Sequence, residues 1–118
     1  MSLVEYILTS TVKTKVLLES GKPSFLADME KLPSGGSAEF EDYEGNIVEL
    51  ADLNADNPGG GWGTEAMNFI TKSASKHGVD LLVLPVGEPG DEAHDRLAKF
   101  YERFGFYDTG EGAYHRDA

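Results

Sequence analysis

Residues 58–64, Pro-Gly-Gly-Gly-Trp-Gly-Thr, have the composition of a loop that binds an anion. Glycine lets a backbone approach a ligand closely and adopt positive φ without steric cost. Successive N–H groups in such a turn, joined to the positive end of a following helix, form a site that suits a pyrophosphate. A plain flexible turn is the alternative, because a glycine-rich loop by itself is weak evidence. The amphipathic helix expected at residues 64–77 favours the anion site.

Two well-known phosphate loops do not match this stretch. A P-loop needs a lysine between its last glycine and its Ser or Thr, whereas Gly63 is followed directly by Thr64. A dinucleotide-binding fingerprint follows the first strand of a βαβ unit and has an acid about 20 residues further on. This loop instead follows an expected hairpin in the middle of the chain, and Asp80 begins the next expected strand.

The elements that must position the loop follow from apolar spacing and from turn residues. Period-2 patterns predict strands and 3.6-residue patterns predict helices. Ser24 and Asp91 are expected to cap helices, and Gly78 and Gly105 to end them. The expected strands are 3–12, 15–19, 38–43, 47–55, 80–86, 106–110 and 113–116, and the expected helices are 25–32, 64–77 and 92–104. This order predicts a single α/β domain over residues 1–118.

Apolar positions predict which faces are buried. In the helix at 64–77, Met67, Ile70 and Ala74 share one face, and in the strand at 47–55 both faces are partly apolar, as in a strand covered on both sides. The core face expected for the helix at 92–104 consists of Ala93, Leu97, Phe100 and Phe104. The polar tail at 108–118 is expected at the surface.

The charge balance bears on partners. The 118 residues contain 21 acidic and 10 basic side chains, for a net charge of −11, and no cysteine. Such a field repels nucleic acid and attracts cationic amines or basic protein tails, although the acids could equally serve solubility. We expect no membrane partner and a soluble, cytoplasmic protein, because no apolar stretch approaches bilayer length. The spacing of His77, His94 and His115 predicts no metal site.

A second motif makes a family resemblance specific. Residues 97–106, Leu-Ala-Lys-Phe-Tyr-Glu-Arg-Phe-Gly-Phe, resemble the Leu-Tyr-Glu-Lys-x-Gly-Phe segment of the GNAT superfamily of acetyl-CoA-dependent N-acetyltransferases. Residues 61–64 resemble that family's pyrophosphate-binding motif, Arg/Gln-x-x-Gly-x-Gly/Ala, with Pro58 standing where the family has Arg or Gln. The resemblance covers roughly residues 46–114. It implies an α/β fold with a mixed, mostly antiparallel sheet, helices on both faces and a reduced N-terminal half.

The resemblance also implies roles for individual residues. Tyr101 would lie near the thioester sulfur and protonate the leaving thiolate, or else is a core aromatic. Glu49 would be the general base, with Glu41 behind it, or else is a solvated strand acid. His94 stands where an Asn often contacts the pantetheine arm. Cofactor contacts are expected from the main chain of Leu53, Asn54 and Ala55 to that arm, and of Gly59, Gly60, Gly61, Trp62, Gly63 and Thr64 to the pyrophosphate.

The expected activity is transfer of an acetyl group from acetyl-CoA to a primary amine, on a small cationic molecule or a protein. An amine can attack a thioester directly once both are positioned, so no cysteine or serine nucleophile is needed. The alternative is a catalytically degenerate module that binds CoA or another protein, and a third hypothesis is an acidic decoy for nucleic-acid-binding proteins. The resemblance also allows a homodimer.

Overall fold

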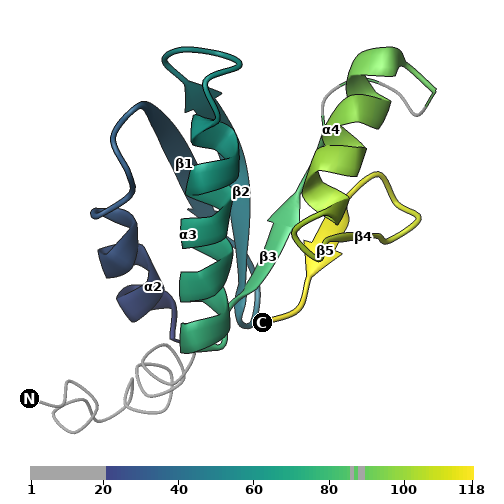
Figure 1. Ribbon diagram of the computed structural model, residues 1–118. Coiled ribbons are helices and arrows are strands. Elements are labelled where there is room, and N and C mark those ends of the chain that lie inside the picture. Colours follow the sequence, from purple (N-terminus) through teal and green to yellow (C-terminus); the bar gives the residue numbers. More distant parts are fainter. Residues whose placement is uncertain (1–20, 86, 88–89) are drawn as a thin grey trace, which may run out of the picture.

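The computed structural model describes residues 21–85, 87 and 90–118 (Figure 1). The two strands expected at residues 3–12 and 15–19 lie outside the described residues. Among the described helices, none has the length and apolar character needed to cross a membrane. The elements in chain order are α2 (Lys22–Met29), β1 (Gly36–Asp42), β2 (Ile47–Ala55), α3 (Trp62–His77), β3 (Asp80–Val83), α4 (Glu92–Glu102), β4 (Tyr107–Asp108) and β5 (Tyr114–Arg116).

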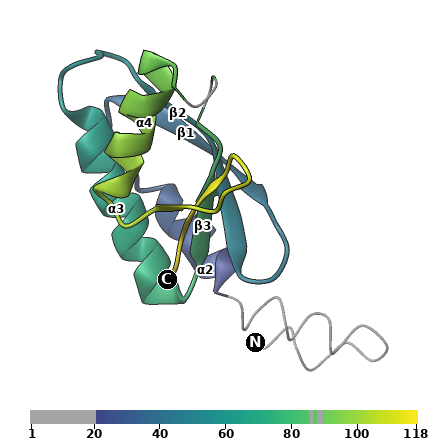
Figure 2. The same ribbon diagram turned by 90° about the vertical axis from the view of Figure 1, so that its right-hand side faces the viewer.

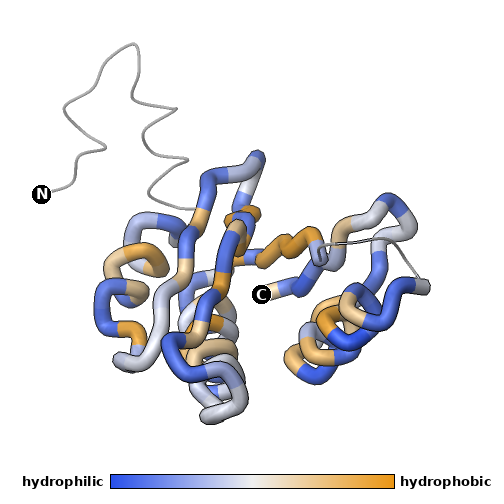
Figure 3. The backbone as a smooth tube through the Cα atoms, turned by 90° about the horizontal axis from the view of Figure 1, so that it is seen from above, coloured by the Kyte–Doolittle hydropathy of each residue, from blue (hydrophilic) through white to orange (hydrophobic). Residues whose placement is uncertain are grey.

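The strands form a mixed five-stranded sheet in the order β1-β2-β3-β5-β4. β2 and β3 are parallel, and the other three neighbouring pairs are antiparallel. The α/β class and the mostly antiparallel sheet are therefore confirmed. β5 lies inside the sheet between β3 and β4, and Tyr114 is only 8% exposed, so the expectation of a surface tail at residues 108–118 is wrong at that strand. Residues 108–112, 117 and 118 are exposed, as expected. Figure 3 shows the most hydrophobic run, β3, in the middle of the molecule.

The β1–β2 hairpin is confirmed, but it contains a bulge that the alternation did not reveal. Glu39 pairs with Asp52 and Phe40 with Leu50, so Ala51 is an extra residue in β2. A bulge shifts the side-chain alternation by one residue. Val48 and Leu50 are buried before it, and Leu53 and Ala55 pack on the core after it. The two faces expected from strict alternation along residues 47–55 are therefore wrong beyond the bulge.

The face of the hairpin opposite the core is open and acidic. Its members are paired across the two strands as Ser37 with Asn54, Glu39 with Asp52 and Glu41 with Glu49. All of them except the half-buried Glu49 are exposed. No helix of the described residues covers this surface, so for that part of the chain the expectation of helices on both faces of β2 is wrong here. Figure 2 shows α3 and α4 on the same side of the sheet.

α3 provides the largest share of the helical core. Met67, Ile70 and Ala74 are fully buried, which confirms the expected face. The helix ends at Gly78, which has a φ of 70° and accepts the left-handed conformation that other residues avoid. It begins at Trp62, two residues before the expected start, so Trp62, Gly63 and Thr64 form its first turn.

α2 lies beside α3 and begins earlier than expected. Gly21 is the N-cap with a φ of 78°, and Pro23 lies in the first turn, where its missing N–H costs no helical hydrogen bond. Ser24 is therefore inside the helix and is not its cap. Phe25 is fully buried and meets Phe40 edge to face, with ring centroids 5.5 Å apart. The helix ends at Met29, before the expected Leu32.

The last strand–helix unit also differs from the expectation. β3 ends at Val83, and Leu84 is 55% exposed, so the strand is shorter than residues 80–86. Asp91 holds the expected N-cap position of α4. The helix ends at Glu102. Phe100 and Phe104 pack on the core as expected, but Ala93 is exposed, and the buried residues of α4 are His94 and Ala98. The final hairpin of β4 and β5 is confirmed.

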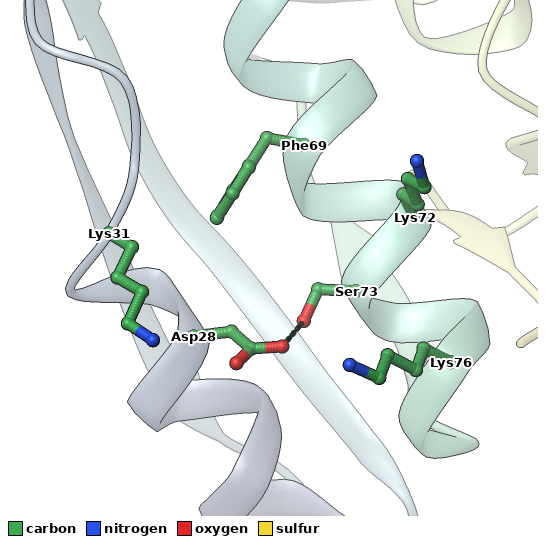
Figure 4. A pocket seen from close by; sticks show the side chains of 6 residues that line it. All are labelled: Asp28, Lys31, Phe69, Lys72, Ser73 and Lys76. Carbon is green, nitrogen blue, oxygen red and sulfur yellow. Dashed lines mark hydrogen bonds between the residues drawn. The ribbon is translucent and has the colours of Figure 1, made fainter.

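A polar clamp joins α2 to α3. The Asp28 carboxylate accepts hydrogen bonds from the Ser73 hydroxyl and from His77 Nε2, both at 2.8 Å. Figure 4 shows Asp28 and Ser73 between the two helices, with Lys31 and Lys76 on either side. These residues line a pocket of about 320 Å³. These hydrogen bonds, that of Ser73 first, lower the pKa of Asp28.

The clamp predicts how stability depends on pH. A carboxyl whose pKa is lower in the folded state contributes stability above its unfolded pKa, and that stability is lost as pH falls through the folded value. The difference in unfolding free energy between wild type and Asp28→Asn should therefore be constant near neutral pH and shrink below about pH 4. Urea unfolding at pH 7, 5, 4 and 3 measures it.

The matched control is Glu30→Gln, which removes a neighbouring exposed acid whose side chain makes no hydrogen bond to another described residue. The difference in unfolding free energy between wild type and Glu30→Gln should not shrink in the same way as pH falls. A wild-type advantage over Asp28→Asn that stays unchanged from pH 7 to pH 3 would contradict the clamp.

Candidate cofactor-binding site

The two parallel strands of the sheet separate beside the glycine-rich loop. β2 and β3 pair at three positions, from Ile47 with Asp80 to Glu49 with Leu82. Beyond Glu49 the strands diverge (Figure 1), and β2 continues to Ala55 with β1 as its strand partner among the described residues. Leu53, Asn54 and Ala55 thus lie on a part of β2 whose second edge has main-chain groups available to a ligand.

The loop that follows β2 has the conformation expected of an anion-binding turn. Gly59 and Gly61 have φ values of 88° and 89°, in the region that favours glycine. The Gly60 N–H donates to Asn57 O at 3.0 Å, so this amide is used inside the loop. The first hydrogen bond of α3 runs from Glu65 N–H to Gly61 O, which leaves the amides at residues 62–64 without a helical acceptor.

Trp62 pins the start of α3 to the beginning of β1. Its indole is only 6% exposed and donates from Nε1 to Pro33 O at 2.8 Å. The ring lies directly against Gly35 and Gly36. The Trp62 side chain packs beneath the loop and leaves its main-chain N–H at the helix N-terminus. The position of the free amides therefore depends on this buried ring.

α4 brings positive charge to the same place. A side-chain atom added at Gly63 would lie 3.6 Å from the Phe100 ring, so Phe100 packs on the first turn of α3. Next to it is a pocket of about 310 Å³ lined by Arg96, Lys99, Phe100 and Arg103. The Arg103 guanidinium lies 5.2 Å from the centroid of the Phe100 ring. Sequence reasoning missed these cations, although their spacing of three and four residues marks one helix face.

Tyr101 lies on the sheet side of α4 in partly apolar surroundings. Its ring centroid is 5.4 Å from that of Phe100 and 5.5 Å from that of Phe106. Burial raises the pKa of Tyr101, and the negative charge of Asp52 raises it further. The phenol is therefore protonated at neutral pH. Asp52, on the diverging part of β2, is near enough for its charge to affect the pKa of this phenol. Sequence reasoning did not single out Asp52.

The two candidate bases are neighbours. Glu41 and Glu49 are directly opposite each other across β1 and β2, on the open face of the hairpin. Glu49 is half-buried and occupies the last position at which β2 pairs with β3, so it lies where the strands begin to diverge. Glu41 is exposed and further from that point, on the outer strand.

His94 is buried and is not a solvated residue. It is 5% exposed and lies in the first turn of α4, beside Gly87. It lines a pocket of about 160 Å³ together with Asp108, Gly110 and Tyr114 from the C-terminal hairpin. The structure thus brings His94 together with that hairpin, whereas the loop, α4 cations and diverging β2 strand form a second group.

Comparisons with known proteins add no relative. No protein-family model matches the chain, and neither a curated protein nor a solved structure matches it.

The contact of Trp62 with Gly36 predicts a specific loss of stability. A Cβ atom at Gly36 would lie 2.4 Å from Asn54 O and 2.6 Å from the Trp62 ring. Gly36→Ala should therefore lower the free energy of unfolding by about 1–3 kcal/mol, since overpacking forces the neighbours to move. Urea denaturation measures the loss, with Ser37→Ala at the exposed neighbouring position as the control. Equal stability of Gly36→Ala and wild type would show that Trp62 does not pack there.

Proposed function

We propose that this chain is a GNAT-like N-acetyltransferase that moves an acetyl group from acetyl-CoA to a primary amine. The observation that carries the proposal is the divergence of β2 from β3 next to a row of main-chain amides. An open strand edge and a helix N-terminus at one place suit a ligand that has both amide groups and phosphates. CoA is such a ligand.

The diphosphate of CoA would lie at the start of α3. The amides of Gly59, Gly61 and residues 62–64 would donate to its oxygens, aided by the positive end of the helix dipole. Arg96, Lys99 and Arg103 line the neighbouring pocket and supply positive charge in a chain of net charge −11. They provide the phosphate contact that Pro58, in place of Arg or Gln, does not make.

The pantetheine arm would extend along β2. Its two amide groups would hydrogen-bond to the open edge at Leu53, Asn54 and Ala55, as an added strand does in β-augmentation. This arrangement directs the thioester toward the point where β2 and β3 meet. Glu49 lies at that point.

The chemistry needs a base for the amine and an acid for the thiolate. Glu49 would take a proton from the ammonium group, directly or through water, and the neutral amine would attack the thioester carbonyl. Tyr101 holds its proton at neutral pH because burial and Asp52 raise its pKa, so it can donate that proton to the departing sulfur. The products are an N-acetylated amine and free CoA.

The acceptor would be cationic. The open face of the hairpin carries Glu39, Glu41, Glu49 and Asp52, and it borders the point where the strands diverge. Such a face concentrates a positively charged amine and orients it toward the thioester. Polyamines and basic peptide tails are acceptors of this kind.

Gly63 offers a test in which binding and folding respond in opposite directions. Gly63 lies in the first turn of α3, and a Cβ there meets Phe100 at an ordinary 3.6 Å. Gly63→Asp should stabilise the helix through its dipole yet repel the diphosphate. The isosteric Gly63→Asn is the matched control. Isothermal titration with CoA should show at least about tenfold weaker binding for Gly63→Asp than for Gly63→Asn. Equal CoA affinities of the two variants would show that the diphosphate does not bind at the N-terminus of α3.

Release of free CoA then tests catalysis. Wild type with acetyl-CoA and spermidine should produce free thiol faster than either substrate alone. Tyr101→Phe and Glu49→Gln should each reduce the rate by about 10²- to 10⁴-fold while leaving CoA affinity nearly unchanged. If the protein binds CoA but releases no thiol with any amine of a panel, the alternative of a catalytically degenerate CoA-binding module holds. If it does not bind CoA, the proposed cofactor is wrong.

A further inference from the structure

The other end of the sheet holds a cluster with the chemistry of a metal site. Asp80 begins β3, His115 is the middle residue of β5, and Asp117 follows that strand. One oxygen or nitrogen atom from each lies within 4.8 Å of the other two. We propose that these three side chains bind a Zn²⁺ ion. The proposal is independent of the acyltransferase.

The distances between donor atoms suit a small divalent ion. His115 Nε2 is 3.0 Å from Asp80 Oδ2 and 3.4 Å from Asp117 Oδ1. Ligands at about 2.1 Å from a tetrahedral zinc ion lie about 3.4 Å from one another. Small side-chain rotations therefore convert the present contacts into coordination, with Nε2 giving up its role as a hydrogen-bond donor and binding the ion through its lone pair.

The surrounding groups hydrogen-bond to the proposed ligands and orient them, as groups around the ligands do in zinc proteins. Asn46 Nδ2 and the Ala118 N–H both donate to Asp80 Oδ1 at 3.0 Å, which holds that carboxylate with Oδ2 toward His115. Tyr107 stacks on the His115 ring, with centroids 5.6 Å apart, and its hydroxyl donates to Asp117 Oδ1 at 3.4 Å. Four segments of the chain, around Asn46, Asp80, Tyr107 and residues 115–118, thus converge on the cluster.

The donor set selects the class of ion. One neutral imidazole and two carboxylates carry a charge of −2, which balances a divalent cation. An imidazole ligand favours zinc over Mg²⁺ and Ca²⁺, which prefer oxygen alone. Three protein ligands leave the fourth tetrahedral position to water.

The location indicates a stabilising role. Asp80 pairs with Ile47, at the start of β2, whereas the glycine-rich loop follows the far end of that strand. The ion would tie the C-terminal residues to β3, where β5 is held by three pairs of residues. A small domain with few residues per strand gains most from such a staple. Zinc bound by the folded state alone raises its stability by mass action.

A second histidine in the chain supplies the control. His77 is 2.8 Å from Asp28, but its partner group has one carboxylate and a serine hydroxyl instead of two carboxylates. His77→Gln therefore removes a histidine–carboxylate pair without touching the proposed ligands. His115→Gln and Asp117→Asn remove a ligand each, and Asp117 is exposed enough for its variant to fold.

The test is isothermal titration of the full, untagged chain with ZnCl₂, with melting temperature as a second readout. Wild type and His77→Gln should bind one equivalent and melt at a higher temperature with zinc. His115→Gln and Asp117→Asn should lose both effects, and Asn46→Ala should bind about 10- to 100-fold more weakly. MgCl₂ should give no saturable binding.

Three results would overturn the site. They are no saturable zinc binding by wild type, wild-type zinc affinity in both His115→Gln and Asp117→Asn, or a loss of zinc binding in His77→Gln as large as that in the ligand variants. If His115→Gln fails to fold, Asp117→Asn alone decides. Saturable Mg²⁺ binding as tight as that of zinc would overturn the choice of metal.

Discussion

The separation of β2 from β3 is the constraint on which the rest of the candidate site depends. Parallel neighbours normally share hydrogen bonds along their whole length, but here the ladder stops after Glu49. The bulge at Ala51 follows two residues later, and a bulge bends the strand that contains it. Trp62 fixes the next segment, because its buried indole holds the start of α3 against Gly35 and Gly36. The strand edge and the helix N-terminus are thereby kept open side by side.

An open edge inside a sheet has an energetic consequence. Main-chain N–H and C=O groups need partners. On this edge no strand of the described residues supplies them, so they are available to solvent or to a ligand. A ligand that carries its own amides can continue the sheet, and its phosphates can reach the free amides of the first turn of α3. Phe100 packs against Gly63 in the first turn of α3, and Arg96 and Lys99 line the pocket next to Phe100. These α4 cations would therefore favour phosphates at the start of α3. The acidic face of the hairpin would attract the cationic acceptor, whereas the cations of α4 would attract the phosphates of CoA.

Local patterns were enough to predict those parts of the fold whose causes are local. The hairpin, the buried face of α3 and its end at Gly78 follow from turn residues and apolar spacing within single segments. The bulge at Ala51 was missed because β2 has apolar residues on both expected faces, so its alternation does not specify a register. The early start of α2 was missed because Ser24 is also a good helix cap, whereas Gly21 and Pro23 suit the helix start that the structure shows.

The missed site residues depend on packing between distant segments. Arg96 and Lys99 gain significance from the contact of α4 with α3, which no spacing along the chain reveals. The cluster of Asp80 with His115 joins residues that are 35 positions apart, so the histidine spacings used to predict the absence of metal did not include it. The available signal was the spacing of two between His115 in β5 and Asp117 just after that strand. The resemblance to the GNAT family predicted cofactor contacts from the main chain of the loop, but not the charges around it.

The most direct measurement is an NMR titration of the labelled chain with CoA, followed at assigned backbone amides. Our account predicts that the signals of Gly59, Gly61 and residues 62–64 shift together with those of Leu53 to Ala55, while Gly78 at the far end of α3 does not move. Loop amides that stay unmoved at the highest CoA concentration would contradict the cofactor site and the acyltransferase with it.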